Sequence, residues 1–137
     1  YIQEMQKIKL INLPKIEDPR GNLTFVEENN HIPFDIKRAY WVYDVPGGEL
    51  RGGHAFKKNK EFIIALSGSF DVIIKDGKTR KKFSLNRSYY GRYIPNMLWR
   101  SLENFSTNAL AVILSSSLFD ANDYLRDFSE FKQLVSK

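Results

Sequence analysis

The sequence lacks several features whose absence narrows its possible functions. It contains no cysteine, which excludes disulfide bonds, thiolate metal sites and catalytic thiols. No apolar run reaches the length of a membrane span, and the first nine residues, YIQEMQKIK, lack the apolar core of a signal peptide. We therefore expect a cytoplasmic protein without a membrane partner. Histidine is also scarce: only His31 and His54 are present, and His31 lies in a loop close to a proline.

The chain is basic, with a formal net charge of +5 and a pI near 9.4. Its positive residues are scattered, and the densest group, residues 75–82 (KDGKTRKK), surrounds an Asp76-Gly77 turn. Such a group is typical of a solvated hairpin tip, so we expect no nucleic-acid partner. A basic balance also suits a small anionic ligand, which needs only two or three well-placed cations.

The residue pattern predicts an all-β fold in a single domain spanning residues 1–137. Of the residues, 42% are hydrophobic and 14% aromatic, with abundant Val, Ile, Phe and Tyr. Short β-type runs separated by turn residues indicate a sandwich or barrel. After Asp120 the apolar residues adopt helical spacing, which predicts a C-terminal helix in one or two pieces, from Tyr124 to Leu134. The predicted strands cover residues 7–13, 23–27, 36–44, 51–56, 61–66, 69–75, 81–85, 89–94, 98–103 and 109–115.

The stretch from Gly48 to Gly68 resembles the first signature of the cupin superfamily. The signature has a Gly, five residues, His-x-His, three or four residues, a Glu, six residues and a Gly, which His54 and Glu61 match here. Phe56 takes the place of the second His. Residues two apart in a strand share a face, so positions 54 and 56 are expected to face a barrel interior, with Glu61 on the next strand. The resemblance implies a cupin jelly-roll β-barrel with a short C-terminal helix.

The second cupin signature is present in a form that argues against a metal. Pro95 and Asn104 keep its spacing, but Arg100 stands at the position of the ligand His. An arginine cannot lose its proton to become a ligand, and a stable Zn, Fe or Mn site normally needs three protein ligands. Because only His54 and Glu61 survive, we expect no metal and no cofactor, and instead acid/base chemistry or anion binding.

The chain as a whole resembles the sugar 3,4-ketoisomerases that act on thymidine-diphosphate (TDP) 4-keto-6-deoxyhexoses, which are metal-free cupins. The resemblance implies an enzyme that moves a carbonyl from C4 to C3 of the hexose through an enediol. Its products serve unusual surface sugars of the lipopolysaccharide or S-layer type. The family also implies a homodimer, with the first strand a candidate for pairing between subunits. The matching motifs are residues 18–23 (DPRGNL), 27–29 (EEN), 32–40 (IPFDIKRAY), 51–55 (RGGHA), 66–69 (LSGS), 91–94 (GRYI), Trp99 and 123–127 (DYLRD).

The candidate catalytic residues are those whose chemistry suits proton transfer and charge stabilisation. His54 is the candidate base, because imidazole titrates near the working pH, the alternative being a structural core histidine. Glu61 is either the group that orients His54 or a hairpin-edge charge. Arg51 and Arg100 are candidates for stabilising enediolate charge. Tyr40 is a candidate for returning a proton or polarising the carbonyl, as are Tyr43 and Tyr93, although any one of the three alone is also a plausible core aromatic.

The candidate substrate-binding residues are Arg20 and Arg38 for the diphosphate, by bidentate geometry, and Trp99, which either stacks on thymine or sugar or belongs to the core. Tyr43 and Tyr93 complete this set.

Two further hypotheses stay open on the sequence. One is a nucleotide-sugar-binding cupin without turnover, because Phe56 replaces a histidine. The other is a 3,5-epimerase-type cupin acting on the same substrate class. The sequence leaves the configuration of the product at C4 undetermined.

Overall fold

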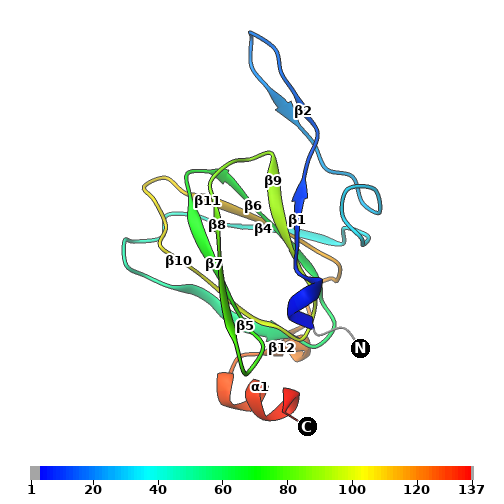
Figure 1. Cartoon of the computed structure of the whole chain (residues 1–137), viewed down its shortest axis with the longest axis vertical. Coiled ribbons are helices and arrows are strands. Elements are labelled where there is room, and N and C mark those ends of the chain that lie inside the picture. The colour runs from blue at the N-terminus through cyan, green and yellow to red at the C-terminus, as the bar shows by residue number, and fades with distance from the viewer. Residues whose placement is uncertain (1–3, 137) are drawn as a thin grey trace.

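The computed structural model describes residues 4–136, which form two antiparallel five-stranded sheets and a separate hairpin (Figure 1). The first sheet has the order β1 (Lys9–Asn12), β9 (Tyr90–Ile94), β6 (Glu61–Ser67), β11 (Leu110–Ser115) and β4 (Arg38–Val42). The second has the order β12 (Tyr124–Leu125), β5 (Arg51–Phe56), β10 (Trp99–Glu103), β7 (Phe70–Lys75) and β8 (Arg80–Leu85). A 3₁₀ helix, η1 (Glu4–Lys7), precedes β1.

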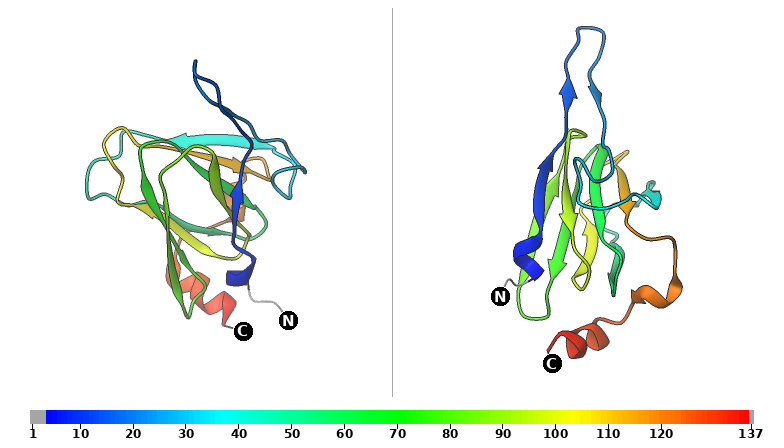
Figure 2. Two further views of the ribbon diagram at one scale, coloured as in Figure 1. Left: turned by 45° about the horizontal axis from the view of Figure 1, so that its top comes forward. Right: turned by 90° about the vertical axis from the view of Figure 1, so that its right-hand side faces the viewer.

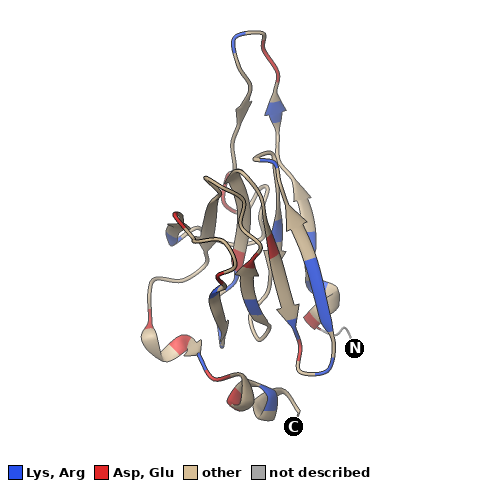
Figure 3. Ribbon diagram, turned by 90° about the vertical axis from the view of Figure 1, so that its left-hand side faces the viewer, with Lys and Arg blue, Asp and Glu red and all other residues tan. Residues whose placement is uncertain are grey.

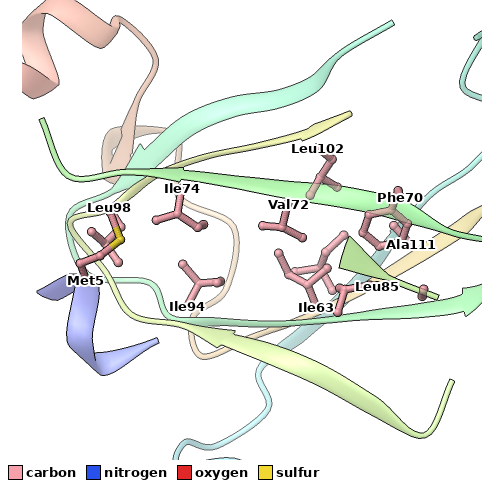
Figure 4. Close-up of a cluster of buried hydrophobic side chains, with 12 residues drawn as sticks. Met5, Ile63, Phe70, Val72, Ile74, Leu85, Ile94, Leu98, Leu102 and Ala111 are labelled. Atoms are coloured by element: carbon pink, nitrogen blue, oxygen red, sulfur yellow. The ribbon is translucent and has the colours of Figure 1, made fainter. Parts of the chain in front are cut away.

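The inner faces of the two sheets enclose the main hydrophobic core (Figure 4). Alternation along β7 points Phe70, Val72 and Ile74 inward, where they meet Ile63 of β6. Two packed antiparallel sheets with short connections form the all-β jelly-roll barrel expected from the sequence. The remaining buried members of this cluster are Met5, Ala65, Leu85, Ile94, Leu98, Leu102, Ala111 and Ile113.

A hairpin formed by β2 (Lys15–Ile16) and β3 (Leu23–Thr24) projects beyond the end of the barrel (Figures 1 and 2). The predicted strand at residues 23–27 is therefore shorter than expected, and the one at 15–16 was not predicted. The two strands pair only with each other, and an isolated pair offers few backbone hydrogen bonds to extend it. Its turn closes through a bond from the Gly21 amide to the Asp18 carbonyl (2.8 Å).

The C-terminal segment differs from the predicted helix. Asp120 caps a 3₁₀ turn, η2 (Ala121–Asp123), and Tyr124 and Leu125 then form strand β12 rather than helix. These two residues pair with Phe56 and Ala55, because β5 would otherwise leave backbone groups unpaired at the sheet edge. The helix α1 (Phe128–Val135) begins only after Asp127, whose carboxylate accepts a hydrogen bond from the Ser129 amide (2.8 Å).

Helix α1 packs at one end of the second sheet, against side chains that face outward from it (Figure 1). Phe131 is fully buried there against Ala55, Trp99 and Leu125. The Trp99 ring lies 5.3 Å from that of Phe128 and 5.9 Å from that of Phe131, measured between centroids. The helix thus anchors the short strand β12 against β5, the strand that carries His54.

The charged residues do not gather on one element. Lys and Arg occur on the hairpin, the strands and the loops, with acidic residues among them (Figure 3). Residues 75–82 form the predicted hairpin tip, in which the Asp76 carboxylate accepts bonds from the amides of Lys78 and Thr79. Within residues 4–136, no helix has the length and hydropathy needed to cross a membrane.

We predict that Phe131→Ala lowers the free energy of unfolding by about 3–5 kcal/mol, because it leaves a cavity beneath α1. The matched control is Leu134→Ala on the same helix, where the side chain is 43% exposed and the expected loss is under about 1 kcal/mol. Urea denaturation of both variants measures the difference. Equal losses would show that α1 is not docked on the sheet.

Candidate active site

Three polar side chains meet inside the barrel, close to its hydrophobic core. Tyr40 comes from β4, Glu61 from the start of β6 and Arg100 from β10, so both sheets contribute. Arg100 and Glu61 are each only 2% exposed. Charged groups at this depth are stable only when they are paired and hydrogen-bonded.

The cluster meets this requirement through a dense set of hydrogen bonds. Arg100 Nε donates to Glu61 Oε1 (2.8 Å), and Arg100 Nη2 donates to Glu61 Oε2 (3.1 Å), which makes the ion pair bidentate. Nη2 also donates to the Tyr40 hydroxyl (2.6 Å), and that hydroxyl donates to Glu61 Oε2. Nη1 donates to the carbonyl of Gly52 (3.2 Å). Every nitrogen of the guanidinium is therefore engaged.

These contacts fix the protonation states of the cluster. Burial raises the pKa of Tyr40 far above its ordinary value, and the Glu61 carboxylate adds to this although the Arg100 charge opposes it. Burial by itself lowers the pKa of Arg100, but the neighbouring Glu61 and Tyr40 outweigh it and raise that pKa. Arg100 is thus charged and Tyr40 protonated throughout the physiological range.

His54 lies directly opposite Arg100 in the pairing of β5 with β10. Its ring packs against Phe56, at a centroid distance of 4.7 Å, and Tyr124, at 5.0 Å, so positions 54 and 56 share the inner face as predicted. Its Nε2 atom is buried and has no hydrogen-bond partner among residues 4–136. A buried polar atom without a partner is costly, which makes it a candidate contact for a ligand.

The His54 imidazole is neutral at physiological pH. Burial lowers its pKa from the ordinary value of 6.5 to about 3, and the positive charges of Arg100, Arg126 and Arg38 act in the same direction. A neutral imidazole can accept a proton, as a general base must.

A cleft of about 300 Å³ opens at the seam between β4 and β5. This volume is at the lower end of the range for small-molecule sites. His54, Tyr40 and Arg100 line it together with Arg51 and Arg126. The remaining lining residues are Trp41, Val42, Gly52, Gly53 and Leu102.

Arginines surround this cleft. Arg51 is exposed at its edge, and Arg38 lies with its guanidinium over the rings of Tyr40 (5.2 Å) and Phe119 (5.7 Å). The Nε atom of Arg38 is buried and unpaired within the described residues. Arg126 follows β12, and its guanidinium lies 4.2 Å from the centre of the Tyr124 ring. With Glu61 neutralising only Arg100, the cleft attracts an anion.

Arg126 and Tyr124 were not among the residues predicted to form the site. Both lie in the motif at residues 123–127, which supported the family resemblance without suggesting a role for either side chain. We expected a helix at this point, and a helix would not place Tyr124 and Arg126 in the site. The pairing of β12 with β5 is what brings them beside His54 and Phe56.

Four of the ten predicted site residues line the cleft, two (Glu61 and Arg38) lie against lining residues, and the other four do not line it. Alternation explains Trp99 and Tyr93: their neighbours Arg100 and Ile94 face inward, so both aromatic rings face outward. Trp99 packs under α1, and Tyr93 packs against Phe34 in a second cluster on the outer face of the first sheet. Both rings therefore pack in apolar clusters outside the cleft, and their predicted contact with substrate stays a prediction.

The other two residues that do not line the cleft are Tyr43, which lines an adjoining hollow with Arg51, and Arg20. Tyr43 is 60% exposed and lies next to a separate hollow on the outer face of the first sheet. Arg20 lies at the tip of the projecting hairpin, where its side chain is 90% exposed and pairs with Asp18 (2.9 Å). Neither side chain lines the cleft that contains His54.

Glu61 belongs to the site but has partners other than the one expected. Its carboxylate binds Arg100 and Tyr40, and no hydrogen bond joins it to His54 among the described residues. It orients the arginine and the tyrosine rather than the imidazole. Because both of its oxygens are engaged and Arg100 occupies the third ligand position, these residues do not fit a divalent metal.

Comparison with known proteins places the chain in a family. The family model described as FdtA: WxcM-like, C-terminal, matches residues 6–136. A curated relative from Aneurinibacillus thermoaerophilus, TDP-4-oxo-6-deoxy-alpha-D-glucose-3,4-oxoisomerase, is 39% identical over 129 residues, covering 94% of this chain and 93% of the relative.

Solved structures agree with this assignment. The TDP-quinovose 3,4-ketoisomerase of Campylobacter jejuni matches with a TM-score of 0.88 and 41% identity, over 93% of this chain and 98% of the other. A histidine-to-asparagine mutant of the Thermoanaerobacterium thermosaccharolyticum 3,4-ketoisomerase, in complex with TDP-4-keto-6-deoxyglucose, matches with a TM-score of 0.92 and 32% identity, over 94% of each chain. This chain therefore belongs to the WxcM-like family of cupins that contains the TDP-sugar 3,4-ketoisomerases.

Proposed function

We propose that this protein is an isomerase that converts TDP-4-keto-6-deoxyglucose into a TDP-3-keto-6-deoxyhexose in deoxysugar biosynthesis. Its family relatives supply the substrate class. The observation that carries the proposal is a neutral, unpaired His54 beside a buried Arg100–Glu61–Tyr40 cluster, in a cleft surrounded by arginines. These groups supply a base, a fixed positive charge and an anion site, and the reaction needs all three.

The proposed reaction exchanges protons and involves no external oxidant. His54 removes the proton from C3, and the electron pair forms an enediolate whose negative charge on O4 is stabilised by the positive charge of Arg100. The C3 hydroxyl then gives up its proton and O4 takes one up, so that the negative charge lies on O3. Protonation of C4 finally leaves the carbonyl at C3 and a hydroxyl at C4, and the net change moves one hydrogen from C3 to C4 and one from O3 to O4. Phe56 excludes a second imidazole from the inner face, and of the three tyrosines considered only Tyr40 lines the cleft. His54 and Tyr40 are thus the groups proposed for proton transfer.

The arginines around the cleft link the proposed base to the diphosphate. Burial is the largest cause of the low pKa of His54, and the charges of Arg100, Arg126 and Arg38 lower this pKa further. A diphosphate held by Arg38 and Arg126, with Arg51 at the cleft edge, would offset the contribution of these charges, while the contribution of burial remains.

We also propose that the protein is a homodimer that pairs through the outer face of the first sheet. Trp41 of β4, the adjoining Tyr43 and Leu66 of β6 are 51–60% exposed, and β4 and β6 flank β11 in this sheet. They border two hollows of about 650 Å³ each, lined largely by apolar residues. A monomer seldom exposes a contiguous apolar patch of this kind, and a second copy of the same face would cover it.

The expected cytoplasmic location stays a prediction.

The proposed activity is tested by incubating metal-stripped protein with TDP-4-keto-6-deoxyglucose in deuterated buffer and following the sugar protons by NMR. We expect a 3-keto sugar carrying deuterium at C4, and a rate at least about 100-fold lower for His54→Asn, since general-base catalysis contributes that much. The affinity for TDP measured by calorimetry is the control, and we expect the variant to retain it.

Three other outcomes would contradict parts of this proposal. Full turnover by His54→Asn would remove His54 from the mechanism. An unchanged sugar spectrum with ligand line broadening would favour a binding protein without turnover, as the Phe56 substitution allows. Deuterium at C3 or C5 of a 4-keto product would favour an epimerase.

The pKa of His54 leads to a prediction about stability against pH. The folded protein takes up this proton only near pH 3, whereas the unfolded chain takes it up near 6.5. Between these values the unfolded state binds more protons, so stability is lost as the pH falls. Relative to His54→Asn, the wild type should lose about 1.4 kcal/mol of unfolding free energy per pH unit between about pH 6 and 4. Urea denaturation at several pH values measures this, and parallel curves would show that His54 titrates normally.

The dimer is tested by sedimentation velocity. We expect the wild type to sediment as a dimer and Leu66→Lys as a monomer, because a lysine at the centre of the apolar face opposes its burial. Leu118→Lys is the matched control, since Leu118 is 71% exposed but lies in the loop before η2. A monomeric wild type, or a Leu66→Lys variant that stays dimeric, would rule out this interface.

A further inference from the structure

The pairing of β5 with β10 contains an irregularity next to the proposed site. His54 pairs with Arg100 and Arg51 pairs with Leu102, so three steps along β5 correspond to two along β10. The extra residue lies in the Gly52-Gly53 pair, and Gly52 has a positive φ of +69°. This is a β-bulge, a feature that re-aims groups beside active sites at the expense of a regular ladder.

The bulge turns the Gly52 backbone toward the Arg100 guanidinium. The Gly52 carbonyl accepts a hydrogen bond from Arg100 Nη1 (3.2 Å). A Cβ atom added to Gly52 would overlap with this same Nη1 atom. The end of an arginine side chain normally moves aside at little cost, but Glu61 and Tyr40 hold this one from the opposite side.

The second glycine of the bulge has a different environment. A Cβ atom on Gly53 would lie 3.6 Å from the Trp99 ring and 3.9 Å from Leu50, which is ordinary van der Waals contact. Gly48, in the loop before β5, shares the positive φ (+85°), but a Cβ atom added there would meet no other atom within 4 Å. Steric contact with Arg100 therefore distinguishes Gly52 from both of these glycines.

We propose that Gly52 is a positioning residue, which sets the location of the Arg100 guanidinium and through it the Arg100–Glu61–Tyr40 arrangement beside His54. The bulge supplies both the carbonyl that Nη1 binds and the space that the guanidinium fills. The role of Gly52 in turnover rests on the proposed isomerase function. Its role in holding Arg100 does not, because that role concerns the free protein.

The kinetic test compares Gly52→Ala with Gly48→Ala. Displacement of a catalytic charge by about 1 Å can reduce turnover about 100-fold, so we expect a loss of this size in kcat for Gly52→Ala with KM within about threefold of the wild type. Gly48→Ala reports the effect of the same left-handed backbone without the Arg100 contact, and its kcat should stay within about threefold of the wild type.

A second readout does not depend on activity. The Nε–H group of Arg100, hydrogen-bonded to the buried Glu61, should give a slowly exchanging side-chain resonance in ¹⁵N NMR, assigned by its loss in Arg100→Lys. We expect this resonance to shift or exchange at least about tenfold faster in Gly52→Ala, and to be unchanged in Gly53→Ala and Gly48→Ala. A Gly52→Ala protein with wild-type kcat and an unchanged resonance would overturn the positioning role.

The two proposals can fail separately. Absence of isomerisation by the wild type would refute the proposed function, while the resonance would still test the position of Arg100. Where Gly52→Ala does not fold, the double variant Gly52→Ala/Arg100→Lys decides, because lysine lacks the Nη1 atom. We expect it to fold with a Tm close to that of Arg100→Lys, and failure of this double variant to fold would assign the effect to backbone strain and refute the proposal.

Discussion

The buried ion pair between Arg100 and Glu61 is the interaction on which the rest of the proposed site depends. A guanidinium and a carboxylate that are each 2% exposed would be strongly destabilising apart, so each requires the other in place. Tyr40 and the Gly52 carbonyl complete the hydrogen bonding and tie β4, β5, β6 and β10 together at one point. The geometry of the proposed site and the packing of the barrel thus depend on the same atoms. A substitution at any of these positions is therefore expected to change both the site and the stability of the fold.

The positive charges around the cleft between β4 and β5 connect this cluster to the recognition of a ligand. Glu61 neutralises Arg100, whereas Arg51 and Arg126 line the cleft, and Arg38 lies beside Tyr40, without an ion pair among the described residues. In the free protein this surplus of positive charge keeps the His54 imidazole neutral, with burial as the larger cause. In the proposed complex, an anionic diphosphate would offset part of that charge, and the same arginines would link substrate binding to the protonation of His54.

The two-residue period of a β-strand decides which predicted residues reach the cleft. Along β10, Arg100 points inward and Trp99 outward, and along β9, Ile94 points inward and Tyr93 outward. Two residues that are neighbours in the sequence therefore lie on opposite faces of the sheet, and only one of them can face the cleft. The outward rings still contribute, since Trp99 holds α1 and β12 in place behind β5.

The sequence by itself determined the all-β class, the strand at residues 51–56 to the residue, and the placement of His54, Glu61 and Arg100 in one cupin site, because these depend on local alternation and short motif spacing. It did not determine that residues 124–125 form a strand. Tyr124 and Leu125 begin a series of apolar residues with helical spacing, but in the structure they pair with the open edge of β5. It did not identify Arg126 or Gly52 either. The proposed roles of these two residues depend on contacts between parts of the chain that are far apart in the sequence. Arg126 lies near His54, and Gly52 lies against Arg100 because of the bulge that one extra residue creates in β5. Only the tertiary structure brings such distant residues together. For that reason only the structure shows which arginines lie near His54 and which backbone carbonyl accepts a hydrogen bond from Arg100.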